Sequence, residues 1–131
     1  MPYLIAADKG LEFFLHTGIC PDMAVGDFDS LSDEGEEFLK SLENTEICRL
    51  RPEKDDSDTQ SAVCRAAERG GKNIVLFGCL GTRLDHTFAN MGLLVWGQQR
   101  GIRVSIYDRY NYITMIESGT VLKRKEQFGK Y

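Results

Sequence analysis

The chain has 131 residues, of which 42% are hydrophobic, so it can bury one core of ordinary single-domain size. Its net charge is -4, from 20 acidic and 16 basic residues, and no basic run is longer than Lys123-Arg124-Lys125, so we expect no nucleic-acid partner. The sequence has no signal-peptide pattern and no apolar run near the ~18 to 20 residues that span a bilayer, so we expect a cytoplasmic protein with no membrane partner.

The four cysteines are far apart in the sequence and form no Cys-x-x-Cys pair. They are Cys20, Cys48, Cys64 and Cys79. This spacing argues against a zinc site and against a small disulfide framework, and it favours reduced, buried thiols.

Strand-like and helix-like segments alternate along most of the chain. Strands are predicted at residues 3–7, 23–25, 47–50, 73–77 and 103–107, and helices at 11–17, 33–42, from about 58 to 69, and 84–100. Gly18 is placed to end the first helix as a left-handed cap, and Asp33 with Glu36 has the form of a capping box for the second. The alternation predicts an α/β fold with a doubly wound, mostly parallel sheet and flanking helices.

The last stretch of the sequence departs from this alternation. Residues 112–116 and 120–125 are two short strand-like runs separated by Glu117-Ser118-Gly119, which is typical of a hairpin. We therefore expect an α/β domain over residues 1–108, followed at 109–131 by the first hairpin of an incomplete C-terminal β domain.

Asp27 and Asp29 directly follow the apolar strand 23–25. In extended backbone, residues i and i+2 project to one side about 6.5 to 7 Å apart, so these two carboxylates can converge on one Mg²⁺ while Phe28 points into the core. The alternative is an Asp-rich turn that caps the following helix, and the spacing does not favour either interpretation.

An acidic or glycine-rich loop follows each predicted strand before residue 85. In a parallel sheet these loops share one edge, so they are expected to form one cleft. The loops contain Asp8 and Gly10, then Asp27 and Asp29, then 55–58, and finally 78–85.

Ser57 and Gln60 have the form of a second capping box. The simpler interpretation of Asp58 is an acidic residue in the first turn of the helix, where the helix dipole favours its charge. The density of negative charge at Asp55, Asp56 and Asp58 favours a bound cation, with Lys54 either compensating or lying on the solvated surface.

The loop before the last long helix has the features of a phosphate site. Gly81 can let backbone N–H groups approach phosphate and Arg83 adds a planar charged group, although a glycine turn needs no ligand. His86 and Asn90 lie four residues apart on one helix face, where a histidine is more often structural than catalytic.

Four blocks of the sequence resemble, in order and spacing, the thiamin pyrophosphokinase family. The blocks are Ala7-Asp8-Lys9-Gly10, Pro21-Asp22 with Gly26-Asp27-Phe28-Asp29-Ser30, Lys54-Asp55-Asp56-Ser57-Asp58-Thr59, and Gly81-Thr82-Arg83-Leu84-Asp85-His86 with Asn90. The resemblance implies a catalytic domain that moves a pyrophosphoryl group from ATP to the hydroxyl of thiamin, giving thiamin diphosphate and AMP.

The resemblance also implies roles for individual residues. Mg²⁺ would fall on Asp27, Asp29 and Asp58, and Asp55 or Asp85 would orient the acceptor hydroxyl or take its proton, with no choice between the two. ATP would lie near Asp8, Gly10, Ser30, Lys54, Ser57, Thr59, Gln60, Gly81, Arg83, His86 and Asn90.

The sequence departs from the family pattern in several places. The family has glycine at the positions of Lys9 and Thr82 and threonine at Ser57. Family members also carry a strand-helix unit before residue 3 and a β-sandwich after 107, which are missing or cut short here, and thiamin is held partly by the β domain of a dimer partner. We therefore expect a homodimer at full length.

Two alternatives to the pyrophosphokinase function are a metal-dependent nucleoside polyphosphate hydrolase and a non-catalytic remnant that binds nucleotide or nothing.

Overall fold

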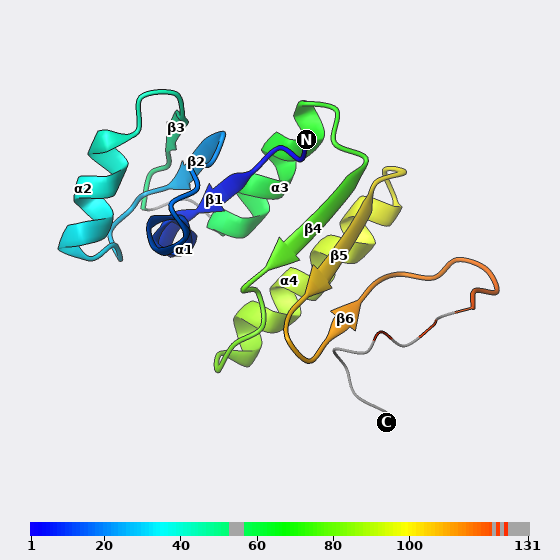
Figure 1. The fold of residues 1–131 in the computed structure, drawn as a ribbon. Coiled ribbons are helices and arrows are strands. Elements are labelled where there is room, and N and C mark those ends of the chain that lie inside the picture. The colour runs from blue at the N-terminus through cyan, green and yellow to red at the C-terminus, as the bar shows by residue number, and fades with distance from the viewer. Residues whose placement is uncertain (53–56, 122, 124, 126–131) are drawn as a thin grey trace. The chain divides into compact units, whose positions relative to one another are not determined.

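The computed structural model describes residues 1–52, 57–121, 123 and 125 (Figure 1). The chain divides into two compact units, Met1–Ala66 and Ala67–Tyr131, which are described here one at a time.

The first unit is built on a parallel three-stranded sheet in the order β1-β2-β3. The strands are β1 (Ile5–Ala7), β2 (Met23–Gly26) and β3 (Glu46–Arg49), and the helices are the short 3-10 helix η1 (Asp8–Gly10), α1 (Leu11–Thr17), α2 (Asp33–Ser41) and α3 (Asp58–Glu68). Strand β2 is the central strand of this sheet and is buried along its whole length. Its continuous apolar sequence is what a strand covered on both faces requires.

The core of this unit draws on the strands, on α1 and α2 and on the loop after β2. Its buried members are Ala6, Leu11, Ala24, Phe28, Leu31 and Leu39. Phe28 therefore anchors the loop between β2 and α2 in the core. Burial of a phenylalanine side chain contributes about 1.5 to 3 kcal/mol, which is enough to hold a short loop in one conformation.

The ends of the helices agree with the sequence prediction in one case and shift by one residue in another. Gly18 takes the left-handed conformation with φ +72° after α1, as predicted. The N-cap of α2 is Ser32 rather than Asp33, because the Ser32 hydroxyl accepts the Gly35 N–H at 3.1 Å. Asp33 is already helical and lies in the first turn, where its charge still favours the helix dipole.

The second unit contains β4 (Asn73–Phe77) and β5 (Arg103–Tyr107), which are parallel, and β6 (Tyr112–Ile113), which runs antiparallel to β5. Helix α4 (Leu84–Gln98) connects β4 to β5 and lies behind them in Figure 1. Its close approach to β5 needs Gly97, since a Cβ there would lie 2.5 Å from a methyl carbon of Val104.

The structure confirms the α/β class and the parallel strands, with three strands in the sheet of each unit. It corrects the position of the C-terminal hairpin. The C-terminal hairpin joins β5 to β6 through a turn at Asp108, and the described residues from 114 to 125 contain no strand. Helix α4 buries Asn90, Leu93, Leu94 and Gly97, whereas Phe88 is 67% exposed.

Within the described residues, no helix has both the length and the apolar character that crossing a bilayer requires.

Candidate metal centre

Three aspartates of the first unit converge at the carboxyl ends of its strands. Asp8 follows β1, Asp27 follows β2, and Asp58 is the first residue of α3. Each offers one carboxylate oxygen, and the three oxygens lie within 4.8 Å of one another. All three side chains are half-buried. Such a cluster of hard oxygen ligands suits a divalent cation, and a cation would offset the mutual repulsion of the three charges.

Asp8 is held in place by the loop that follows β2. Its backbone has φ +46°, an uncommon conformation for a residue with a side chain. One carboxylate oxygen accepts the Phe28 N–H at 2.9 Å, and the other accepts the Ser30 hydroxyl at 2.6 Å. Because each carboxylate oxygen can accept a second bond, both remain able to bind an ion.

Gly26 makes the close approach of Asp8 possible. Its φ of +151° is rarely adopted by residues with a side chain. A Cβ at this position would lie 3.1 Å from three atoms of Asp8, including a carboxylate oxygen. The glycine of the Gly26-Asp27 pair is therefore required by packing at the site itself.

The backbone at Phe28 supports the second of the two interpretations of Asp27 and Asp29, a turn in place of an extended segment. Phe28 is buried as expected, but its φ is +65°, so the chain turns here and is not extended. The Asp29 N–H donates to the Asp27 carboxylate at 3.0 Å, and the Asp29 side chain is exposed. Among the described residues, the group that could hold an ion consists of Asp8, Asp27 and Asp58. It includes Asp8, which was not expected as a ligand, and it does not include Asp29.

The start of α3 presents Asp58 to this cluster. The Ser57 hydroxyl accepts the Gln60 N–H at 3.1 Å, which confirms Ser57 as the helix cap. Thr59 is half-buried in the same turn. Lys54, Asp55 and Asp56, also expected near this site, lie outside the described residues.

Gly10, which was expected near the nucleotide, has open space around its Cα. It ends η1 with a right-handed helical φ of -56°, and a Cβ there would meet no atom within 4 Å.

The phosphate-loop candidates lie in the second unit. Arg83 donates to both carboxylate oxygens of Asp85, from Nε at 3.2 Å and from a terminal nitrogen at 2.6 Å. These hydrogen bonds lower the pKa of Asp85 below its usual value. Both side chains are exposed, so the pair contributes little to stability.

Two other candidates in the second unit differ in burial. Asn90 is buried, and its side-chain amide donates to the Cys79 carbonyl at 3.1 Å, so it ties α4 to the preceding loop. His86 and Gly81 are exposed. The i,i+4 spacing therefore does not give His86 and Asn90 the same environment.

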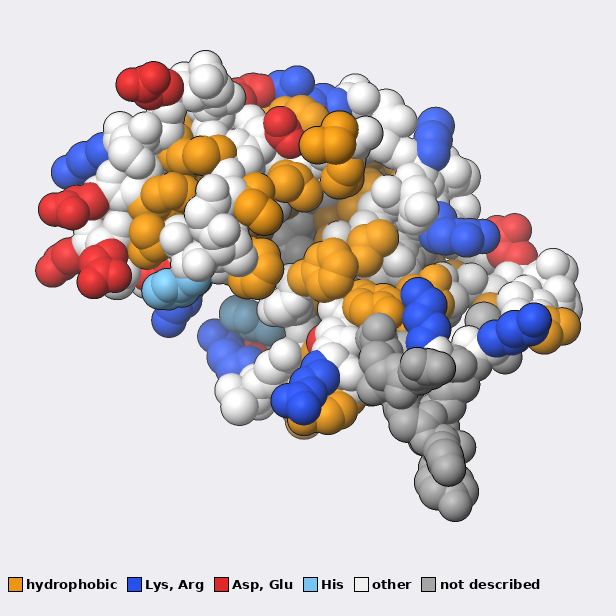
Figure 2. Space-filling view, viewed as in Figure 1, with side chains coloured by type: hydrophobic (Ala, Val, Ile, Leu, Met, Phe, Trp, Pro, Cys, Tyr) orange, Lys and Arg blue, Asp and Glu red, His pale blue; other side chains and the backbone are white. Residues whose placement is uncertain are grey.

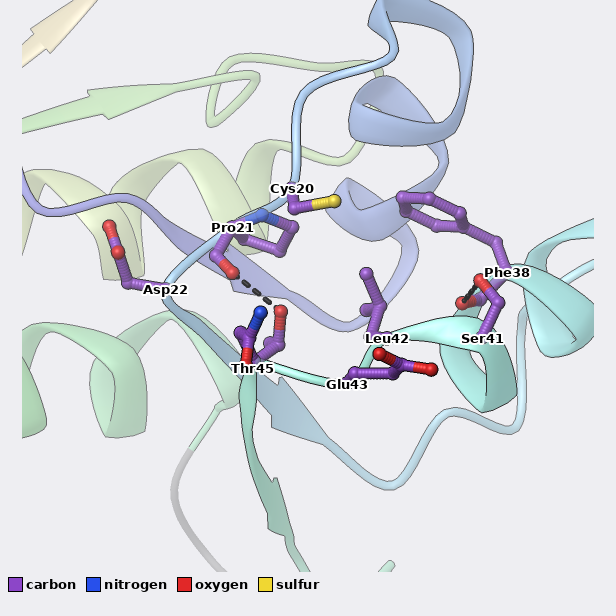
Figure 3. Close-up of a pocket in the computed structure, with 9 residues that line it drawn as sticks. Cys20, Pro21, Asp22, Phe38, Ser41, Leu42, Glu43 and Thr45 are labelled. Carbon is purple, nitrogen blue, oxygen red and sulfur yellow. Dashed lines mark hydrogen bonds between the residues drawn. The ribbon is translucent and has the colours of Figure 1, made fainter.

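A separate cavity of about 340 Å³ lies at the amino ends of β2 and β3 (Figure 3). Its lining includes Cys20, Pro21, Phe38, Leu42 and Glu43. The Asp22 carboxylate beside it accepts the Leu4 N–H at 2.7 Å, so this motif residue has a structural role. The aspartate cluster follows the opposite ends of the strands, and the two sites are distinct.

Comparison with known proteins places this chain in a family. The family model for the thiamin pyrophosphokinase catalytic domain matches residues 1–106 of this chain. The thiamine pyrophosphokinase of Bacillus subtilis (strain 168) is 32% identical over 127 residues, which cover 97% of this chain and 59% of that protein.

Solved structures give the same result. A thiamin pyrophosphokinase family protein from Enterococcus faecalis superposes with a TM-score of 0.73 and 34% identity, covering 84% of this chain and 53% of that one. Thiamine pyrophosphokinase from Bacillus subtilis gives 0.72 and 31%, covering 82% and 50%. Thiamin pyrophosphokinase from Candida albicans, at 17% identity and a TM-score of 0.61, supports the fold alone.

The fold and the aspartate cluster together define an α/β domain with a carboxylate-rich site at the ends of its parallel strands. The chain belongs to the thiamin pyrophosphokinase family, within its catalytic domain. It spans between a half and three fifths of the length of these relatives.

Proposed function

We propose that this chain binds Mg-ATP and acts in the transfer of a pyrophosphoryl group from ATP to the hydroxyl of thiamin. The observation that carries the proposal is the convergence of Asp8, Asp27 and Asp58 in a member of this family. The ion is assigned to these three residues, so Asp8 replaces Asp29 in the ligand set expected from the sequence.

The donor set fits Mg²⁺. Oxygens bound to one Mg²⁺ are at most about 4.2 Å apart, because each Mg–O distance is about 2.1 Å. The three carboxylate oxygens lie within 4.8 Å of one another, so side-chain movements that shorten these distances would bring them into range. Half-burial of the carboxylates leaves room for phosphate oxygens and water.

In the proposed reaction the hydroxyl oxygen of thiamin bonds to the β-phosphorus of ATP. The bond from that phosphorus to the bridging oxygen of the α-phosphate breaks, AMP leaves with the bridging oxygen, and the hydroxyl proton is released. Bound Mg²⁺ would neutralise charge on the phosphates. Three of the five guanidinium N–H groups of Arg83 are not used by Asp85 and are available for a phosphate.

The two candidates for the proton acceptor differ in what can be said of them. Asp85 has a lowered pKa and a cationic partner, both of which make it a weaker base. Asp55 lies outside the described residues. Homodimer formation and a cytoplasmic location stay predictions.

The test is to mix the chain with Mg-ATP and thiamin and to measure thiamin diphosphate and AMP. Formation of both products, lost in Asp27→Asn and in the presence of a chelator, supports the proposal. Release of AMP without thiamin indicates a hydrolase. Absence of Mg-ATP binding heat in calorimetry contradicts the proposal and identifies a non-catalytic remnant.

A further inference from the structure

One face of the sheet in the second unit carries an open row of aromatic side chains. Helix α4 packs against the face that bears Leu76, Val104 and Ile106, and alternate residues of the same strands point the other way. The aromatic face is defined here by Val75, Phe77, Arg103, Tyr107, Tyr112 and Lys125, which line a hollow of about 360 Å³.

The rings on the aromatic face form a continuous row across β4, β5 and β6. The ring centroids of Phe77 and Tyr107 are 5.9 Å apart, and those of Tyr107 and Tyr112 are 5.6 Å apart. Phe77 is 70% exposed and Tyr112 is 43% exposed. Solvent-exposed aromatic rings on a sheet offer surfaces on which other planar groups can stack.

The charge on the aromatic face is positive. Arg103 is exposed, and Lys125 Nζ lies 5.1 Å from the centroid of the Tyr107 ring. The described residues that line the hollow include no carboxylate. In Figure 2, Lys and Arg side chains lie beside hydrophobic side chains over β4 and β5. The local composition therefore complements an anion that carries flat apolar groups.

The net charge of the whole chain conceals this local excess. Residues 1–66 contain 6 basic and 15 acidic side chains, and residues 67–131 contain 10 and 5, so the two parts have net charges of -9 and +5, which add to -4. The expectation that the chain has no nucleic-acid partner rested on this total and on the absence of a basic run longer than Lys123-Arg124-Lys125. The charge of the second unit does not support it.

We propose that the aromatic face binds single-stranded nucleic acid, with bases stacked on Phe77 and Tyr112 and backbone phosphates paired with Arg103 and Lys125. This goes beyond the proposed function and uses none of its residues. A second copy that paired through the same face is a poorer occupant, because it would place Arg103 and Lys125 against the same cations. A purely apolar peptide would leave both cations without a partner.

The experiment measures fluorescence anisotropy of a labelled oligothymidylate titrated with the whole chain. We expect a dissociation constant of roughly 10⁻⁴ to 10⁻⁶ M that weakens with salt, and much weaker binding to a blunt duplex whose bases are already stacked. Phe77→Thr should weaken binding about fivefold to 150-fold, because stacking of one base is worth about 1–3 kcal/mol. Arg103→Gln should lower the salt slope by about 0.7.

Phe88→Gln and Arg100→Gln are the matched controls. They remove an exposed aromatic ring from α4 and a cation from the turn that follows it, away from the aromatic face, and should leave binding unchanged. Phe77 and Arg103 are both exposed, and circular dichroism checks that their variants fold.

Three results would overturn the proposal. The first is no binding, or equal binding by Phe77→Thr, Arg103→Gln and the controls. The second is equal competition by polyglutamate, which indicates a general polyanion or acidic-peptide surface. The third is a dimer that Phe77→Thr converts to monomer, which assigns the face to a second copy.

Discussion

The Asp8 carboxylate accepts the backbone N–H of Phe28 at 2.9 Å, and this hydrogen bond joins the end of β1 to the loop after β2. Because Phe28 is itself buried in the core, its position fixes that of Asp8. The same left-handed turn at Phe28 leaves the Asp29 side chain exposed. One core residue thus decides which aspartates meet.

Asp8→Asn is predicted to weaken Mg²⁺ binding at least about tenfold, since it removes one of three charges while leaving an oxygen to accept the Phe28 N–H. Isothermal titration with Mg²⁺, or electron paramagnetic resonance with Mn²⁺, measures the change. Thermal stability should stay close to that of the unchanged chain.

Asp29→Asn is the matched control, because it removes the same charge from the same loop at an exposed side chain. We expect little change in ion affinity. A larger loss in Asp29→Asn than in Asp8→Asn would restore Asp29 to the ligand set and remove Asp8 from it.

Gly26→Ala is predicted to destabilise the fold by about 1–3 kcal/mol, because alanine is strained at φ +151° and its Cβ would press against Asp8. Urea unfolding followed by circular dichroism gives the change. Gly10→Ala provides the comparison, since Gly10 has a helical φ and open space around its Cα. It should be neutral or slightly stabilising. Equal losses in the two variants would mean that the contact with Asp8 is not the cause.

The sequence predicted the strands and helices of both units because apolar periodicity and caps are local signals. The arrangement of Asp27 and Asp29 could not be predicted from spacing, since i,i+2 convergence assumes an extended backbone. The positive φ of Phe28 depends on burial of its ring, which is a tertiary effect. The glycine at position 26 was the available signal for a close approach in this loop.

The packing of α4 shows a second limit. Apolar residues lie on most sides of this helix, so periodicity did not define one inner face, and Phe88 is exposed although it is aromatic. The helix approaches β5 through Gly97, whose contribution is the lack of a side chain.

The position of the C-terminal hairpin was also predicted wrongly. The Asp108 carboxylate accepts the N–H groups of Tyr110 and Asn111, and this turn joins β6 to β5.

Arg83→Gln is predicted to raise the pKa of Asp85 toward its ordinary value, because the guanidinium hydrogen bonds that stabilise the charged carboxylate are lost. A group with a lowered pKa stabilises the fold above its unfolded pKa, and this contribution is lost as the pH falls through the folded pKa. The contribution is small because both side chains are exposed. Carboxyl carbon chemical shifts followed through acid titration measure the pKa, and an unchanged titration of Asp85 would contradict the role of Arg83.

Cys79 is predicted to resist alkylation in the folded chain far more than Cys20. Burial raises the pKa of the Cys79 thiol to about 11, and its Sγ donates to the Phe77 carbonyl at 3.6 Å, whereas Cys20 is exposed. Because the thiolate is the reacting form, Cys79 should react slowly near neutral pH and faster as the pH rises toward 11.

Pulse labelling with iodoacetamide, followed by peptide mass spectrometry, gives the rate at each cysteine. Labelling in denaturant is the control, because unfolding removes the burial that raises the Cys79 pKa, and the two cysteines should then react at similar rates. If Cys79 reacted as fast as Cys20 in the folded chain near neutral pH, the loop after β4 would have to open readily to solvent. The burial of Asn90 and its hydrogen bond to the Cys79 carbonyl argue against such opening, since the buried amide would lose its partner.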